Sequence, residues 1–291
     1  MREPIGRHVP TKRSSQARVL QRPIRWAAFC CLIIGLAPAQ ADEPAALTDI
    51  PKQSGWIVTV GGFGDLEPTF EGARRHSLGF HPIIDYRALG SREWLNLPND
   101  GFDFALIEAQ DFRAGPVVNG RWQRDVSSLV RGFRHVGSID LSAETGVFAE
   151  WWPAEFLRAR IELREAVFGA RGMIADLSAD WVWRPAKQWT LSAGPRLSLA
   201  DSAFMRSYYS VDTQQAISSG LPVYSAPAGV RSTGGGSMLK YKWSENVSTM
   251  AFVEYQRLAT SAAESPLIDD RGSPNQLTFG LGLSYSFVVG W

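Results

Sequence analysis

The sequence predicts an all-β fold, a transmembrane antiparallel β-barrel of about twelve strands with short turns at one end and longer loops at the other. Three observations predict it. Most of the chain after residue 54 alternates apolar and polar side chains, the connections alternate between tight and long, and the tryptophans gather at one end of the predicted strands. Segments of about ten residues with one apolar and one polar face are typical of such barrels.

Residues 1–41 have the three parts of a secretory signal peptide. Seven basic side chains and one acid precede an apolar run over residues 26–37, and Ala39 and Ala41 follow in an A-x-A arrangement. The run is shorter than the ~20 residues that a spanning helix needs, which argues against an uncleaved anchor. We therefore expect Sec export with cleavage near Ala41, a periplasmic segment over residues 42–54, and a barrel over residues 55–291.

Loss of this leader changes the composition. Both cysteines, Cys30 and Cys31, leave with it, so the rest of the chain has no disulfide, thiolate nucleophile or cysteine metal site. The remainder carries 23 basic and 28 acidic side chains, a net charge of about −5. Nucleic-acid binding proteins present a basic stripe, so no nucleic-acid partner is expected.

The alternation is clearest in the middle of the chain. In "LRARIELREAV" (157–167) apolar side chains alternate with charged ones, and "MIADLSADWVW" (173–183) and "WTLSAGPRLSL" (189–199) repeat the pattern. Because a strand sends successive side chains to opposite faces, each segment has an apolar face and a polar face. The predicted strands are 55–64, 78–88, 92–97, 101–108, 111–122, 138–151, 155–168, 172–183, 188–200, 229–243, 246–259 and 276–291.

The connections between these strands differ in length at the two ends. Those at the starting end are tight, at 89–91, 109–110, 152–154, 184–187 and 244–245. Most at the other end are long, at 65–77, 123–137, 201–228 and 260–275, although 98–100 and 169–171 are short. Bacterial barrels have short periplasmic turns and longer outer loops, so we assign the tight end to the periplasm.

Six tryptophans fall at this periplasmic end. They are Trp56, Trp151, Trp183, Trp189, Trp243 and Trp291. Amphipathic indole rings gather at the boundary of a membrane, so the pattern predicts a periplasmic aromatic belt. We expect the barrel as a whole to contact outer-membrane lipid and lipopolysaccharide. A soluble β-sandwich also alternates, but it has no reason to gather tryptophans at one end.

The last predicted strand carries apolar side chains at every second position from Leu277 to Trp291. We interpret them as the lipid face of a strand that pairs with the first strand, closes the barrel and removes the sheet edges. Its final residues resemble the signal read by the barrel-assembly machinery, which is an expected partner; they are Tyr285, Phe287, Val289 and Trp291. The alternative is that the signal ends at Phe287 and residues 288–291 are a tail.

The polar faces of neighbouring strands carry opposite charges that would meet in the lumen. The set is Glu144, Glu150, Arg158, Arg160, Glu162, Arg164, Asp176, Asp180 and Arg196. We favour a lumen closed by cross-strand ion pairs, because twelve strands leave only modest space. The alternative is a narrow pore whose constriction is lined by these charges.

The loop at 201–228 contains aromatic residues that have two interpretations. It could fold inward and plug the lumen, or Phe204, Tyr208 and Tyr209 could form an exposed contact patch. No enzyme motif accompanies it: the histidines after the leader are His76, His81 and His135, and the chain has no GxSxG, HExxH or histidine pair at ligand spacing. We read His81 as a wall residue and predict no catalytic, cofactor-binding or metal-binding residues.

Several segments in fixed order carry a family resemblance. They are "GWIVTVGGFGDLEPTFEGARRHSLGFHPIIDYR" (55–87), "FRAGPVVNGRWQRD" (112–125), "ETGVFAEWWPAEFLRARIELREAV" (144–167), "ADLSADWVWRP" (175–185), "GPRLSLADSAFMRSYYSVD" (194–212) and "YQRLATSAAESPLI" (255–268). Together they resemble the MipA/OmpV family of Gram-negative outer-membrane proteins, over nearly the whole chain after the leader. No single segment is a catalytic signature, but their order and spacing are specific.

The resemblance implies a scaffold protein rather than an enzyme. It implies association with a lytic transglycosylase and a penicillin-binding protein, which would link the cutting of peptidoglycan to its synthesis. Other members of the family are described as adhesins or porin-like proteins. A scaffold is therefore the first functional hypothesis, and a narrow channel for small polar solutes and a surface adhesin are the alternatives.

Overall fold

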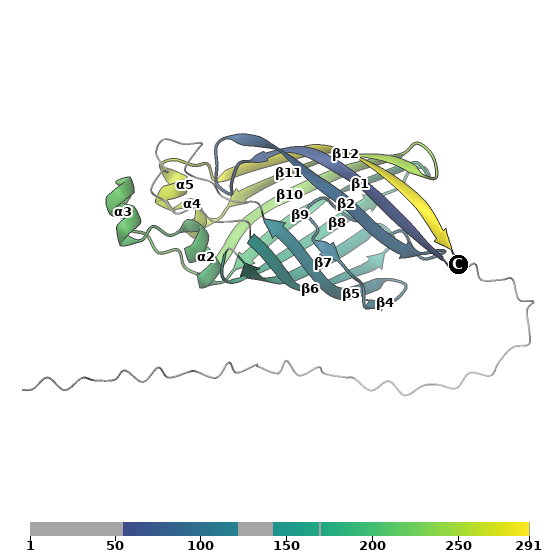
Figure 1. Cartoon of the computed structure of the whole chain (residues 1–291), viewed down its shortest axis with the longest axis horizontal. Helices are drawn as coiled ribbons and strands as arrows, with labels where there is room; N and C mark the ends of the chain where they lie inside the picture. The colour runs from purple at the N-terminus through teal and green to yellow at the C-terminus, as the bar shows by residue number, and fades with distance from the viewer. Residues whose placement is uncertain (1–54, 122–141, 169, 291) are drawn as a thin grey trace, which may run out of the picture. The chain divides into compact units, whose positions relative to one another are not determined.

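The computed structural model describes residues 55–121, 142–168 and 170–290, which form one antiparallel sheet curved into a nearly closed barrel (Figure 1). Its strands are β1 (Gly55–Pro68), β2 (His76–Ala88), β3 (Phe102–Asp103), β4 (Ile107–Glu108), β5 (Phe112–Arg121), β6 (Ser142–Ala154), β7 (Leu157–Phe168), β8 (Met173–Trp183), β9 (Trp189–Ala200), β10 (Gly229–Lys242), β11 (Val247–Leu258) and β12 (Asn275–Gly290). Its helices are α2 (Ser202–Tyr209), α3 (Thr213–Ser219), α4 (Thr260–Ala263) and α5 (Pro266–Asp269). None of the described helices is long and apolar enough to cross a membrane.

The order of strands confirms the predicted fold class. Neighbours follow β2-β1-β12-β11-β10-β9-β8-β7-β6-β5-β3, and β4 also pairs with β5. The first and last strands pair as expected, with an unbroken register from Gly55↔Gly290 to Leu66↔Phe279. The helices lie in the long loops at one end of the barrel, and the end of β12 lies at the other (Figure 1).

Two predicted strands are wrong. Residues 92–97 form no strand, and the predicted strand 101–108 is reduced to the two-residue strands β3 and β4. The cause lies in Leu95 and Leu97, which are buried inside the barrel with Trp152 and Phe252. An apolar residue reads the same in the sequence whether it faces lipid or the lumen, so the alternation here was misleading.

The barrel has a seam beside these short strands. Within the described residues no ladder joins β2 to β3 or β4. The rings of Tyr86 and Phe104 span the seam with their centres 5.5 Å apart. The prediction that pairing of β1 with β12 removes every sheet edge is therefore wrong, because the edge has moved to β2 and β3.

The described part of the long loop after β9 folds back onto the mouth of the barrel. Asp201 caps α2 by accepting a hydrogen bond from the backbone nitrogen of Phe204 at 2.7 Å. Phe204, Tyr208 and Tyr209 are buried in an outer apolar cluster with Ile174 of β8 and Leu258 of β11. The predicted exposed contact patch is wrong, because these rings pack against lumen-facing side chains instead of facing solvent.

Candidate functional site

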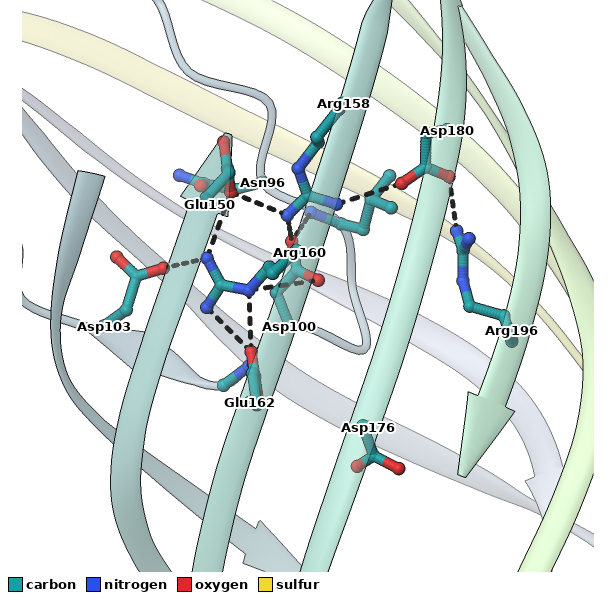
Figure 2. Close-up of polar contacts among 12 residues, drawn as sticks. Asn96, Asp100, Asp103, Glu150, Arg158, Arg160, Glu162, Asp176, Asp180 and Arg196 are labelled. Carbon is teal, nitrogen blue, oxygen red and sulfur yellow. Dashed lines mark hydrogen bonds and ion pairs between the residues drawn. The ribbon is translucent and has the colours of Figure 1, made fainter. Parts of the chain in front are cut away.

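Two arginines on β7 form the centre of the charged lumen. The register places Arg158 opposite Asp180 of β8 and Arg160 opposite Glu150 of β6. Arg158 donates to Asp180 at 3.0 Å, and Arg160 donates to Glu150 at 3.1 Å. Figure 2 shows the side chains converging between the strands. The predicted cross-strand ion pairs thus follow directly from the antiparallel register.

Glu150 is the hub of this cluster. Its Oε2 atom accepts from Arg113 at 3.0 Å, Arg158 at 2.9 Å and Arg160 at 3.1 Å, and its Oε1 atom accepts from the Trp152 indole at 2.7 Å. Sequence reasoning missed Arg113, which stands opposite Glu150 in the β5–β6 register. The alternation within residues 111–122 was the signal that could have found Arg113, but the sequence prediction did not align this strand with β6.

Arg164 organises the outer half of the cluster. Glu162 of β7 and Asp176 of β8 stand opposite each other in the register, which places like charges side by side. Arg164 forms ion pairs with both and donates to Glu144 at 3.1 Å. Like charges on facing residues destabilise a sheet, so this arginine offsets their repulsion.

The remaining predicted member also lies in the lumen. Arg196 of β9 donates to Asp180 at 2.7 Å (Figure 2). It also lies 3.7 Å from Glu254 of β11. The structure therefore brings all nine predicted charges together. We call them, with Arg113, Asp100 of the loop before β3 and Asp103 of β3, the charged cluster.

An inner segment, residues 89–101 between β2 and β3, crosses the lumen. Its Asp100 lies 2.6 Å from Arg158, and the backbone nitrogen of Gly101 donates to Glu162 at 3.2 Å. At its other end Glu93 contacts Lys240 at 2.9 Å and also pairs with Lys242 of β10. Sequence reasoning missed these contacts because it placed a turn and a strand here.

The inner segment also fills space. Leu95 and Leu97 pack with Phe63, Met238 and Phe252. The Arg92 guanidinium lies 4.2 Å from the centre of the Trp152 ring. A cavity beside residues 97–99 has a volume of about 10 Å³, enough for about one water molecule.

Burial shapes the electrostatics of the charged cluster and of the inner segment. Glu150, Arg158 and Asp180 are 0 % exposed, so their charges are neutralised by one another instead of by water. Burial raises the pKa of Glu93, but the Lys240 and Lys242 ammonium groups outweigh it and the net pKa falls to about 2. Arginine and carboxylate at these distances make charge-assisted hydrogen bonds, which hold the strands and the inner segment in register.

The structure places five of the six predicted belt tryptophans at the end of the barrel that has tight turns. Trp56, Trp151, Trp183, Trp189 and Trp243 all have exposed rings, up to 67 % for Trp243. Trp291 and the predicted signal peptide lie outside the described residues. Tyr285, Phe287 and Val289 lie at the end of β12, and their role in assembly stays a prediction.

Two other polar sites lie toward the outer end. Arg74, Arg257, Glu264 and Asp269 line an open hollow of about 490 Å³ between the outer loops. Among the residues that the structure describes, one group has donor atoms close enough to hold a metal ion: Asp65 and Glu67 of β1 with His81 of β2.

A family model matches most of the chain. The chain matches the family described as MltA-interacting protein MipA over residues 60–287. No match was found among curated proteins. Similar solved structures include the NanC porin, with 10 % identity, 80 % of this chain and 100 % of that chain covered, and a TM-score of 0.39. OmpT of Vibrio cholerae has 10 % identity, coverage of 80 % and 98 %, and a TM-score of 0.32.

Proposed function

Because the chain belongs to the MltA-interacting protein MipA family, we propose that it is a non-enzymatic outer-membrane barrel with a filled lumen, whose periplasmic rim docks a lytic transglycosylase. The observation that carries this proposal is the filled lumen. The inner segment crosses the barrel, and the charges that would line a pore are buried against each other. A conducting constriction needs charges in contact with water, so the geometry favours a docking role over a channel.

The outer face supports a place in the membrane. Leu78 and Phe80 of β2 and Leu281 of β12 are among the most exposed apolar side chains. Such a surface is costly in water and stable in lipid. The exposed tryptophans at one end support a membrane boundary there. The tight turns at the same end support its assignment to the periplasm.

The docking surface is then limited to the tight turns. Phe156, in the turn between β6 and β7, is exposed and packs against Trp181 with ring centres 4.5 Å apart and planes tilted by 39°. Arg184 and Lys187 are exposed in the turn between β8 and β9, and Arg184 donates to the carbonyl of Glu155. An aromatic side chain beside arginine is the composition that dominates binding energy in interfaces.

The test combines a pull-down with a conductance measurement. The protein purified in detergent is immobilised and offered the lytic transglycosylase and the penicillin-binding protein of its own cell envelope. We expect retention of the transglycosylase, and loss of at least about tenfold in affinity for the double variant Phe156→Ala, Arg184→Ala. The matched control is Ser244→Ala, Asn246→Ala, in an exposed turn of the same rim, which should bind as the wild type does.

Planar bilayers provide the second measurement. We expect no conductance steps from the wild-type protein. Reproducible conductance steps that disappear with Arg160→Ala would show that the lumen is a channel. The proposal of a filled lumen would then be wrong. Equal retention of the transglycosylase by both double variants would place the docking surface elsewhere.

A further inference from the structure

One polar group in the barrel has no part in the charged cluster. Asp65 and Glu67 lie on the lumen face of β1 near its outer end, and His81 lies on the lumen face of the adjacent β2. Their donor atoms all lie within 4.8 Å of one another. The His81 Nε2 atom lies 3.5 Å from Asp65 Oδ2 and 3.9 Å from Glu67 Oε1.

These separations suit a shared metal ion. Two donors bound to one tetrahedral zinc ion at about 2.0–2.1 Å are about 3.4 Å apart. Two carboxylates and a neutral imidazole would supply a net charge of about −2, which matches a divalent cation. Three protein donors leave a fourth position for water.

A glycine leaves the space that such an ion needs. The register pairs Asp65 with Gly79, whose side-chain position points between the donors. A Cβ atom built on Gly79 would lie 2.3 Å from Asp65 Oδ1, 3.0 Å from Glu67 Oε1 and 3.0 Å from His81 Nε2. The three donors therefore surround the place where a side chain at position 79 would begin, and any larger residue there would crowd them.

The burial of Asp65 provides an independent observation. Its side chain is 4 % exposed, and its Oδ1 atom makes no hydrogen bond. Within the described part of the chain, His81 is the one cationic side chain within 4 Å of either carboxylate of the group. A buried carboxylate oxygen without a donor is costly, and a bound cation removes that cost.

The group is accessible to an ion from outside, and its imidazole is held in place by a neighbouring ring. The side chains of Glu67 and His81 are 29 % and 25 % exposed, so an ion can enter from the outer side. The imidazole is held by stacking on Phe63, with ring centres 4.8 Å apart and planes 17° apart. The site is thus open on one side and rigid on the other.

We propose that Asp65, Glu67 and His81 bind a divalent transition-metal ion of the zinc class. The imidazole donor decides between metals: it suits zinc and its neighbours, whereas calcium and magnesium prefer oxygen donors. The ion ties β1 to β2 near the outer mouth. Since β2 is the edge strand at the seam, this tie holds the least supported long strand of the sheet.

The experiment measures zinc directly. The protein purified in detergent is stripped with a chelator, dialysed against zinc chloride at low micromolar concentration, and analysed for bound zinc per chain. We expect about one zinc ion per wild-type chain, and a weakening of more than about tenfold for Glu67→Gln, since even groups that only support a ligand can cost tenfold. His76→Gln changes an exposed histidine outside the group and should leave binding unchanged.

Two further variants keep the test decisive. Gly79→Ala should block zinc binding by crowding the three donors, and Asp65→Asn should weaken zinc binding. Heat-modifiable migration on a gel shows whether each variant is folded. Zinc should raise the temperature at which the wild type loses its heat-modifiable form, because a ligand that binds only the folded state stabilises that state. A folded wild type that takes up no zinc, or folded Glu67→Gln and Asp65→Asn variants with wild-type zinc content, would overturn the proposal. Displacement of zinc by an equal concentration of calcium would also overturn it.

Discussion

The charged cluster and the outer apolar cluster fill the same lumen by different means. In the charged cluster most side chains stand on adjacent strands, and the antiparallel register brings them together, as with Arg158 and Asp180. In the outer apolar cluster α2 and the loop after β11 supply Phe204, Met205 and Ile268, which pack on strand residues far away in the sequence. The comparison shows that most polar contacts in the charged cluster form between adjacent strands, whereas the outer apolar cluster needs side chains from the loops.

The two clusters should also respond differently to substitution. An arginine buried among carboxylates depends on each partner, because loss of one leaves charge uncompensated in a medium of low dielectric constant. An apolar cluster loses stability in proportion to the volume removed and can relax around the gap. Three substitutions, from the largest expected effect to the smallest, test this difference.

Glu150→Gln should have the largest effect. It removes the shared charge of three buried arginines, and we expect the free energy of unfolding to fall by about 3–5 kcal/mol. Urea unfolding of the purified protein in lipid, followed by tryptophan fluorescence, measures the loss. Glu245→Gln, in an exposed turn, is the control and should change stability by less than about 0.5 kcal/mol. Equal stability of the two variants would mean that the buried charges do not depend on one another.

Met205→Ala should have a smaller and more local effect. Met205 is fully buried in α2, so its truncation leaves a cavity that costs about 2–3 kcal/mol. We expect faster protease cleavage within residues 201–228 while the barrel keeps its heat-modifiable form. Ile217→Ala, at a side chain on α3 that is 74 % exposed, should be cleaved at the wild-type rate. Global unfolding of the Met205→Ala variant would show that the two clusters are one cooperative unit.

Glu93→Gln should have the smallest effect. The carboxylate pairs with Lys240 and Lys242 but is 38 % exposed, so solvent screens the pairs and we expect a loss below about 1 kcal/mol at neutral pH. Because the folded-state pKa of Glu93 is lowered from 4.5 to about 2, its contribution is complete above pH 4.5 and disappears as the pH falls through 2. The difference in stability between wild type and variant should therefore shrink over this range. A difference that stays constant down to pH 2 would contradict the ion pairs.

The same contrast explains what the sequence could predict. Alternation located all ten long strands of the described residues, because each must present an apolar face to lipid and a polar face to the lumen. That Arg160 and Glu150 both face the lumen followed from that alternation, whereas their pairing is set by the register of β6 with β7. The prediction of the charged cluster therefore rested on a property of each strand taken separately.

The inner segment could not be predicted in this way. Trp94, Leu95 and Leu97 read as a short strand, because local hydrophobicity does not distinguish a side chain in lipid from one inside the barrel. Phe204 and Tyr209 were ambiguous for the same reason, and packing against Ile174 decided their position. The metal candidate was missed because its residues join only through the register of β1 with β2, in which Asp65 faces Gly79.

The pairing of β1 with β12 has a consequence for the rate of folding. Trp56 and Val289 are partners although more than two hundred residues separate them along the chain. Contacts of such long sequence separation form late, because the entropy of closing the intervening loop must be overcome before they stabilise anything. Until that ladder forms, both strands carry unsatisfied hydrogen-bonding groups that other chains can pair with. The joining of these two strands is therefore expected to be the slow step, and the period before it is when aggregation competes with folding.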